Sequence, residues 1–399
     1  MKDGYIRANA VLFLTTLGYG ITTAFFSVYL ASRGIPLAGI GLIFGIGSII
    51  AGLFRVPIGI VVDCLGRKKF LILGTIGYPV FAIGLIYAST VSHYIILNLF
   101  IQFFGAIFWT AFSAHFFDII TKGREGMDIA GKNVISYSAS ASAPILAGFI
   151  ATKLGFSNLF IIGAAIAASA IFIALTIKDF NNKQKLCYNA LQMEYSCILK
   201  TKGLALIAAI IFLVDFTCMF WSIFMPIWLL QQGISLEAIG LILTINIIIC
   251  TLIQIPLGRA IDKMQIRHII IPGLLLFWLG GMIFFAFRNY FSYLIGRVMI
   301  GSSSDTAYCP AVGMFAKLTP KVEHGGAVAL IFGLSTAISG VGALVGGLLT
   351  AKYGIPRILW AVSFIPLIAG ITLLWSNTLK KKGTQFHKVH HVMAHVPRH

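Results

Sequence analysis

The amino-acid sequence predicts an all-α integral membrane protein with twelve transmembrane helices in two pseudo-symmetric six-helix bundles. Of its 399 residues, 58% are hydrophobic and only 11% are charged, whereas about 25% of residues are charged in a typical water-soluble domain. Apolar runs of about twenty residues recur along the chain, and each is long enough to cross a hydrocarbon layer of about 30 Å as a helix. Finally, Gly59-x-x-x-Asp63 recurs in weaker form 199 positions later, as Gly258-x-x-x-Asp262, which indicates an internal duplication.

The apolar runs define the spans in chain order. They are continuously apolar and lack the alternation of outer-membrane strands, so they indicate helices rather than a barrel. The first run is the repeat partner of the seventh, and we therefore interpret it as a permanent helix rather than a signal peptide. The expected spans are residues 9–31, 38–62, 70–90, 92–117, 133–152, 157–177, 204–231, 237–261, 269–287, 291–316, 326–350 and 355–376.

A long polar interval between the sixth and seventh spans predicts the domain boundary. We expect a six-helix bundle at 1–180, a cytoplasmic linker at 181–203, a second six-helix bundle at 204–378 and a basic, His-rich cytoplasmic tail at 379–399. Two such halves of the same topological sense are typical of secondary transporters, whose substrate site lies near mid-depth at the interface of the halves.

The distribution of positively charged residues along the chain predicts its orientation in the membrane. The formal net charge is +18, and with both termini in the cytoplasm most Lys and Arg fall on the cytoplasmic side, as the positive-inside rule requires. The exceptions are Arg33, Lys153, Arg288, Lys352 and Arg357 in outer loops and Arg55, Arg259 and Arg297 within spans. The charge therefore indicates a multi-pass protein of the cell membrane that contacts anionic lipid, and not a nucleic-acid partner.

The sequence contains no motif that indicates another functional class. Six cysteines are scattered without a CxxC pair, and nothing here calls for a disulfide. There is no HExxH motif, no nucleophile with an ordered base and no phosphate-binding loop, so we expect neither an enzyme nor the use of ATP. We also expect no cofactor, and a monomer.

The strongest motif is Gly59-x-x-x-Asp63-x-x-Gly66-Arg67-Lys68-Lys69, between the second and third spans. It resembles the signature of the major facilitator superfamily, and the weaker copy lies where that family places it. The resemblance implies a secondary transporter that works by alternating access and takes a small-molecule substrate. It also implies a cytoplasmic gate, formed here by Gly59, Asp63, Gly66, Arg67, Lys68, Asp118 and Asp262.

The gate has a physical rationale of its own. Gly59 removes a side chain where two helices are expected to approach closely. Asp63 can pair with Arg67 and face the N-terminus of the eleventh span, whose free N–H groups favour an anion. Asp118 can compete for Arg67 when this clasp opens. The alternative is that Arg67 and Lys68 serve only as orientation charges.

Buried charges indicate the translocation path, because ionisable residues inside spans are costly and by default functional. Asp215 lies in the seventh span, and Arg297 and Asp305 lie in the tenth. The resemblance implies that spans one, four, seven and ten line the cavity. We expect Asp215 or Asp305 to take up and release a proton or to bind a cationic group, with Arg297 as counter-charge or anion contact. A purely structural ion pair between spans seven and ten is the alternative.

Further residues are candidates for the cavity or for proton transfer. They are Arg55, which precedes Pro57 in the second span, His115, which could relay protons or pack beside Asp118, and the aromatic residues Tyr19 and Trp221.

The direction and cargo of transport rest on weaker signals. Small residues and a proline in the fifth span resemble the motif of antiporters in this superfamily and favour proton-coupled export; they are Ala130, Ala139, Ala143, Pro144, Ala147 and Gly148. Import of a small metabolite is one alternative. Another is transport of a divalent transition metal through Asp215 with Cys218 and Asp305 with Cys309, helped by histidines in the tail.

Overall fold

The computed structural model describes residues 2–120, 124–177, 202–265, 267–318 and 324–375. All regular structure in this part of the chain is helical. The first half contains α1 (Lys2–Thr23), α2 (Phe26–Ser32), α3 (Leu37–Leu65), α4 (Arg67–Tyr87), α5 (Val91–Ile119) and α6 (Glu125–Leu175). The second half contains α8 (Lys202–Gln231), α9 (Leu236–Lys263), α10 (Arg267–Ala286), α11 (Tyr290–Leu318), α12 (His324–Tyr353), α13 (Ile355–Val362) and α14 (Phe364–Trp375).

These helices trace the predicted spans and confirm the fold class. Within the described ranges, ten helical segments are long and apolar enough to cross a membrane. Helix α6 supplies two spans, because its backbone leaves helical geometry at Gly155, where φ is 81°. A turn divides the first span into α1 and α2, and another divides the last into α13 and α14. The predicted linker up to residue 201 and the predicted tail lie outside the described residues.

The duplication is visible in the helix bounds. Helices α5 and α11 are both 29 residues long, and their first residues are 199 positions apart. Glycines with positive φ recur at the same offset, since Gly34 (76°) matches Gly233 (81°) and Gly155 (81°) matches Gly354 (84°). Glycine adopts this backbone conformation without the penalty of a side chain, so the two copies share their turns as well as their helices.

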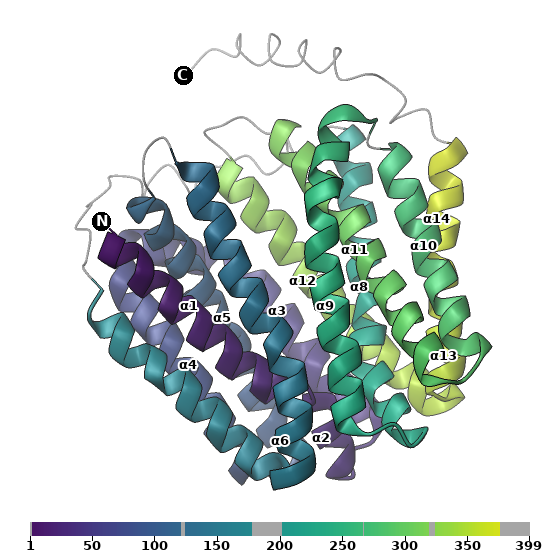
Figure 1. The fold of residues 1–399 in the computed structure, drawn as a ribbon, viewed down its shortest axis with the longest axis horizontal. Helices are drawn as coiled ribbons and strands as arrows, with labels where there is room; N and C mark the ends of the chain where they lie inside the picture. Colours follow the sequence, from purple (N-terminus) through teal and green to yellow (C-terminus); the bar gives the residue numbers. More distant parts are fainter. Residues whose placement is uncertain (1, 121–123, 178–201, 266, 319–323, 376–399) are drawn as a thin grey trace.

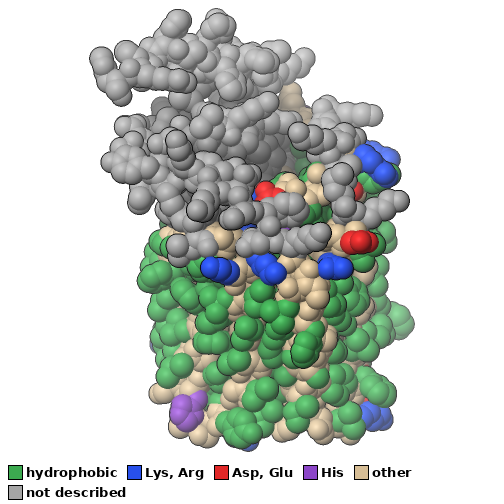
Figure 2. All heavy atoms as spheres, turned by 90° about the vertical axis from the view of Figure 1, so that its left-hand side faces the viewer, with side chains coloured by type: hydrophobic (Ala, Val, Ile, Leu, Met, Phe, Trp, Pro, Cys, Tyr) green, Lys and Arg blue, Asp and Glu red, His purple; other side chains and the backbone are tan. Residues whose placement is uncertain are grey.

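The helices lie side by side, and the chain up to α6 mostly fills the left of Figure 1 while the chain from α8 onward fills the right. We call the end at which α1 and α8 begin the terminal face, and the end with the short turns at 33–36, 232–235 and 354 the short-loop face. Figure 2 shows a broad band of hydrophobic side chains with Lys and Arg gathered along its upper edge. This is the surface expected of a protein surrounded by lipid.

The core lies between the helices and is rich in aromatic side chains. Among the largest fully buried residues are Phe25, Phe108, Phe112, Trp221 and Phe224. Stacked and edge-on pairs recur among these rings, for example Phe108 with Phe112 at 5.8 Å between centroids. Such pairs add to the packing between helices that holds a membrane bundle together.

Candidate functional site

Glycines form two tight contacts between the halves near the short-loop face. A Cβ atom on Gly41 of α3 would lie 2.5 Å from the carbonyl oxygen of Ala343 and 2.6 Å from the Cα of Gly347, both in α12. A Cβ on Gly148 of α6 would lie 2.5 Å from the carbonyl oxygen of Leu236 in α9. The α3–α12 and α6–α9 contacts are therefore possible only with glycine at these positions.

The repeat explains why the two contacts resemble each other. Gly41 aligns with Gly240, and Gly148 aligns with Gly347, and a Cβ on Gly240 would meet the carbonyl oxygen of Pro144 in α6. Gly41 therefore meets Gly347, the repeat counterpart of Gly148, while Gly148 and Gly240, the counterpart of Gly41, both lie in the α6–α9 contact. A hydrogen bond from the Thr244 hydroxyl to the Ala141 carbonyl oxygen, at 2.7 Å, reinforces the α6–α9 contact.

The glycines of the gate motif behave differently. A Cβ on Gly59 would have Thr110 as its nearest neighbour, at 4.0 Å, and a Cβ on Gly258 would meet nothing within 4 Å among the described residues. Among the described residues, no helix approaches Gly59 closely, and the close approach expected there stays a prediction. Helices α3 and α9 are tightly packed near the short-loop face, at Gly41 and Gly240.

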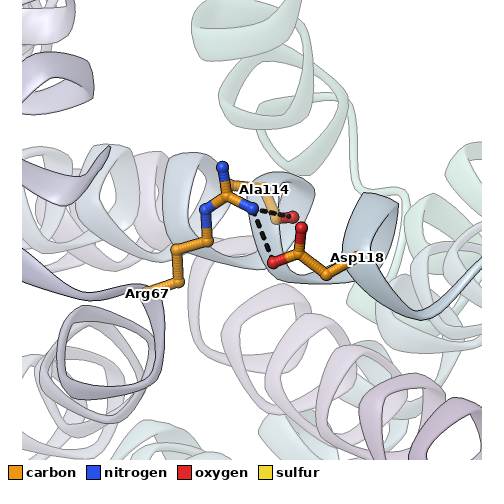
Figure 3. Close-up of polar contacts among 3 residues, drawn as sticks. All are labelled: Arg67, Ala114 and Asp118. Atoms are coloured by element: carbon orange, nitrogen blue, oxygen red, sulfur yellow. Dashed lines mark hydrogen bonds and ion pairs between the residues drawn. The ribbon is translucent and has the colours of Figure 1, made fainter. Parts of the chain in front are cut away.

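The charged part of the gate is partly assembled. Arg67, at the start of α4, donates from Nη1 to Oδ2 of Asp118 at 2.5 Å and to the carbonyl oxygen of Ala114 at 3.2 Å (Figure 3). Gly66, with φ of 108°, separates α3 from α4 and places Arg67 beside the end of α5. The Lys68 side chain is half-buried. The side chains of Asp63 and Asp262 lie outside the described part of the structure.

A cavity of about 120 Å³ opens between the two halves. It is lined by Tyr19 of α1, Arg55 of α3, Tyr78 of α4, Gln102 and Trp109 of α5, and Thr336 of α12, together with small or aliphatic residues. Arg55 crosses between the halves, since its Nη1 lies 3.4 Å from the Thr336 hydroxyl and its guanidinium lies 5.7 Å from the centre of the Phe332 ring. The structure thus brings together Arg55 and Tyr19, two of the sequence candidates.

The candidate acids of the second half contact different helices. Asp215 of α8 accepts a hydrogen bond from the hydroxyl group of Ser335. Ser335 directly precedes Thr336 in α12. Because consecutive Cα atoms are about 3.8 Å apart, Arg55 and Asp215 contact neighbouring points on one helix. Asp305 of α11 instead lies close to Gln254 and Cys250 of α9.

Arg297 does not act as the counter-charge of either aspartate. Its Nε is buried and has no hydrogen-bond partner among the described residues, and no ion pair there joins it to Asp215 or Asp305. Helices α8 and α11 are linked instead by Cys218 and Ser304, whose side-chain atoms lie 2.9 Å apart. Of the two interpretations of these charges, the structural ion pair is therefore wrong.

Two further candidates are core residues. Trp221 is fully buried and packs edge-on against Phe284 at 5.0 Å, so it does not line the cavity. His115 of α5 is 2% exposed, in the same helix as Asp118.

The divalent-metal alternative lacks a cluster of ligands. Asp215 and Cys218 have different partners, in α12 and α11. In the described ranges no three His, Cys, Asp or Glu side chains come close enough to hold a metal ion.

Sequence reasoning missed the hydroxyl and amide groups that surround the buried charges. Ser335 and Thr336 of α12 contact Asp215 and Arg55, and Gln102 donates to the Ser48 hydroxyl at 3.2 Å beside the cavity. A sequence signal was present, because polar residues inside apolar spans tend to hydrogen-bond across helices.

Comparison with known proteins places this architecture in a family. The model of the Major Facilitator Superfamily matches residues 9–212 and 204–390. The MFS-type transporter MJ1560 of Methanocaldococcus jannaschii is 23% identical over 370 residues, which cover 90% of this chain and 94% of that protein. The inner membrane transport protein YajR of Escherichia coli is 26% identical over 36% of this chain and 31% of its own length.

Solved structures share the fold at low sequence identity. The nucleoside transporter NupG has a TM-score of 0.77 at 16% identity, with 95% of this chain and 100% of NupG covered. A bacterial homologue of the human lysosomal transporter Spinster, in an inward-facing and occupied conformation, has a TM-score of 0.77 at 11% identity, with 93% and 95% covered. The family model matches both halves of the chain, and the structure shows a duplicated helical bundle with a cavity between the copies. This chain therefore belongs to the major facilitator superfamily of secondary transporters.

Proposed function

We propose that this transporter exports a small organic solute in exchange for protons, with its substrate in the cavity at Arg55 and its proton on Asp215. The observation that carries the proposal is the arrangement around α12. The cavity of one half and a buried carboxyl group of the other contact consecutive hydroxyl residues, Thr336 and Ser335. A change of protonation at Asp215 can therefore alter the helix that also closes the cavity.

We further propose that the structure represents the inward-facing state of the cycle, with both termini in the cytoplasm. The glycine contacts of Gly41 and Gly148 close the short-loop face, and the Arg67–Asp118 pair lies at the opposite, terminal face. The fold likeness to an inward-facing Spinster homologue agrees with this assignment.

Export is favoured by the small residues of α6. Pro144 and Gly148 lie where α6 packs directly on α9, and both belong to the antiporter-like motif of the fifth span. NupG is a nucleoside transporter by name, so import of a metabolite is the outcome that a transport assay has to exclude. A passive channel would not need two alternative closures.

The test is transport by purified protein in liposomes with an imposed pH gradient. A pH-sensitive dye reports proton flux while organic acids, organic cations, sugars, nucleosides and divalent metals are added in turn. Proton flux evoked by an organic solute, lost in Asp215→Asn and kept in the matched surface control Asp3→Asn, is the expected result. Solute flux that ignores the pH gradient, or a response to metals alone, would contradict the proposal.

A further inference from the structure

Arg297 of α11 is a cation inside the helix bundle that lacks a protein partner. Its Nε is enclosed and has no hydrogen-bond acceptor among the described residues, and no ion pair there includes its guanidinium. All side chains of α11 from Tyr290 to Thr306 are described, and Thr306 lies about 14 Å farther along the helix than Arg297. Arg297 is therefore well inside the described part of this half. A charge inside a protein is normally paired, so we expect a partner from outside the chain.

The first copy shows what this position requires for packing alone. The repeat aligns Arg297 with Asn98 of α5. Asn98 is 5% exposed, and its Nδ2 donates to the carbonyl oxygen of Ile43 in α3 at 2.7 Å. A neutral amide with a protein acceptor fulfils the structural role there. The second copy has a cation at the same position and, among the described residues, no acceptor for its enclosed nitrogen, which indicates a role beyond packing.

The groups around Arg297 are polar and come from three helices. Cys218 of α8 and Cys250 of α9 both lie close to its guanidinium. Ser304, two turns farther along α11, has its hydroxyl oxygen 2.9 Å from the sulfur of Cys218. All four side chains are partly exposed, although they lie between helices of a membrane bundle. Polar groups in such positions line pathways that water and solutes can enter.

The charge and shape of the guanidinium select the ligand. One negative charge neutralises it, and its planar fork of donors matches a carboxylate through two parallel hydrogen bonds. A dianion would bring an unbalanced charge into the bundle, which is costly. The acids of this region contact other groups, since Asp215 accepts a hydrogen bond from Ser335 and Asp305 lies close to Gln254. The guanidinium therefore fits a small monoanion.

We propose that Arg297 forms a binding site for the carboxylate of a small monoanion, between α8, α9 and α11. The Cys218 thiol and the Ser304 hydroxyl are the neighbouring groups that can donate further hydrogen bonds to it. The cavity at Arg55 is lined by residues of α1, α3, α4, α5 and α12, so the site at Arg297 is a second one. It goes beyond the proposed function and does not depend on it.

The test is thermal unfolding of the detergent-purified protein as sodium acetate is added to a buffer without chloride or other carboxylates. We expect a saturable rise in the melting temperature, because a ligand that binds only the folded state stabilises it. Arg297→Asn, which installs the residue of the first copy, should weaken the response roughly tenfold or more, because hydrogen bonds to charged groups are the stronger ones. Arg288 is exposed, and the matched control Arg288→Asn should respond like the wild type.

Two further comparisons separate a binding site from a structural role and a carboxylate from other anions. Without added anion, Arg297→Asn should melt at the wild-type temperature or above it, because the substitution removes an unpaired charge. Arg297→Lys keeps the charge but loses the planar fork, and it should bind acetate severalfold more weakly. Sodium chloride and sodium sulfate serve as comparison salts. Because salts also act on any folded protein, the quantity compared is the difference between wild type and Arg297→Asn in each salt.

Several results would overturn the assignment. One is an acetate response that is absent from the wild type or equal in Arg297→Asn. Another is a melting temperature of Arg297→Asn that falls below the wild type without anion, which would mean a structural role. A full acetate response in Arg297→Lys, or a larger difference in chloride or sulfate than in acetate, would exclude a carboxylate site.

The liposome assay identifies the source of the carboxylate. Loss of solute-evoked proton flux in Arg297→Asn would assign it to the transported solute, and unchanged flux would assign it to a separate small acid. The two proposals can also fail separately. Acetate binding through Arg297 without proton flux for any solute leaves this site standing and contradicts the exchange mechanism, whereas proton flux without an acetate response does the reverse.

Discussion

Substituting Gly41 by alanine should open the short-loop face. A Cβ at this position would lie 2.5 Å from the carbonyl oxygen of Ala343, about 0.9 Å short of the 3.4 Å at which ordinary contacts begin, and 2.6 Å from the Cα of Gly347. Both neighbours are backbone atoms of α12, so neither can rotate away. Helices α3 and α12 must therefore separate for the extra methyl group to fit.

The size of the effect follows from the state in which the clash occurs. Overpacking of a tight site costs about 1–3 kcal/mol, and this cost falls only on the state with a closed short-loop face. The helix propensity gained from alanine, up to about 1 kcal/mol, is common to both states and cancels. The ratio of open to closed molecules should rise roughly 5- to 150-fold.

The assay is double electron–electron resonance between spin labels at Arg33 and Tyr353, in a background without the six native cysteines. These two sites are exposed near the short-loop ends of α2 and α12, so their separation reports whether that face is closed. Gly41→Ala should add or enlarge a population at longer distance. Gly59→Ala is the matched control in the same helix, because its Cβ would have a nearest neighbour only at 4.0 Å. An unchanged distribution in Gly41→Ala, or equal opening in Gly59→Ala, would refute the reasoning.

Three other substitutions test the remaining contacts. Asp118→Asn removes the charge that pairs with Arg67 at 2.5 Å. Because both side chains are partly exposed, the free energy of unfolding should change by no more than about 1 kcal/mol. The transport rate measured by stopped flow should fall severalfold, and a wild-type rate would count against a gate role. Ser335→Ala should shift the pH at which liposome transport is half-maximal without abolishing transport, because it removes the donor to Asp215, and an unshifted profile would separate Ser335 from coupling. Trp221→Ala should lower the free energy of unfolding of the purified protein by about 3–5 kcal/mol and leave the rate of liposome transport within twofold, since Trp221 packs against Phe284 away from the cavity; a tenfold loss of transport with unchanged stability would reverse that assignment.

The fold could be predicted from the sequence because hydropathy, duplication and chain direction are properties of the chain itself. The spans, the repeat and the paired glycines could all be read from residue order. The aligned pairs Gly41 with Gly240 and Gly148 with Gly347 were visible, yet their function was not. Only the structure shows that these four positions form the two tight helix contacts between the halves.

The side-by-side neighbours of each helix could not be predicted from the sequence in the same way. Whether Trp221 faces a cavity or Phe284 depends on the rotation of α8 about its axis, and the continuously apolar sequence of α8 does not specify that rotation. The same limit applies to Gly59, because the sequence does not specify how the two halves pack. Asp215 and Arg55 were recognisable as buried charges, but their hydroxyl partners on α12 were not.

The divergence of the two copies explains how one duplicated fold can serve an asymmetric task. The repeat preserves the residues that set backbone geometry, so Gly34, Gly155 and their counterparts keep the same positive φ values. It does not preserve charge, since Arg55 is matched by Gln254. The first copy thus offers a cation to the cavity and the second offers Asp215 through Ser335. Because both charges contact α12 at adjacent residues, a solute at Arg55 and a proton at Asp215 would influence the same helix, and it is this shared contact, more than either charge alone, that makes coupled transport physically reasonable.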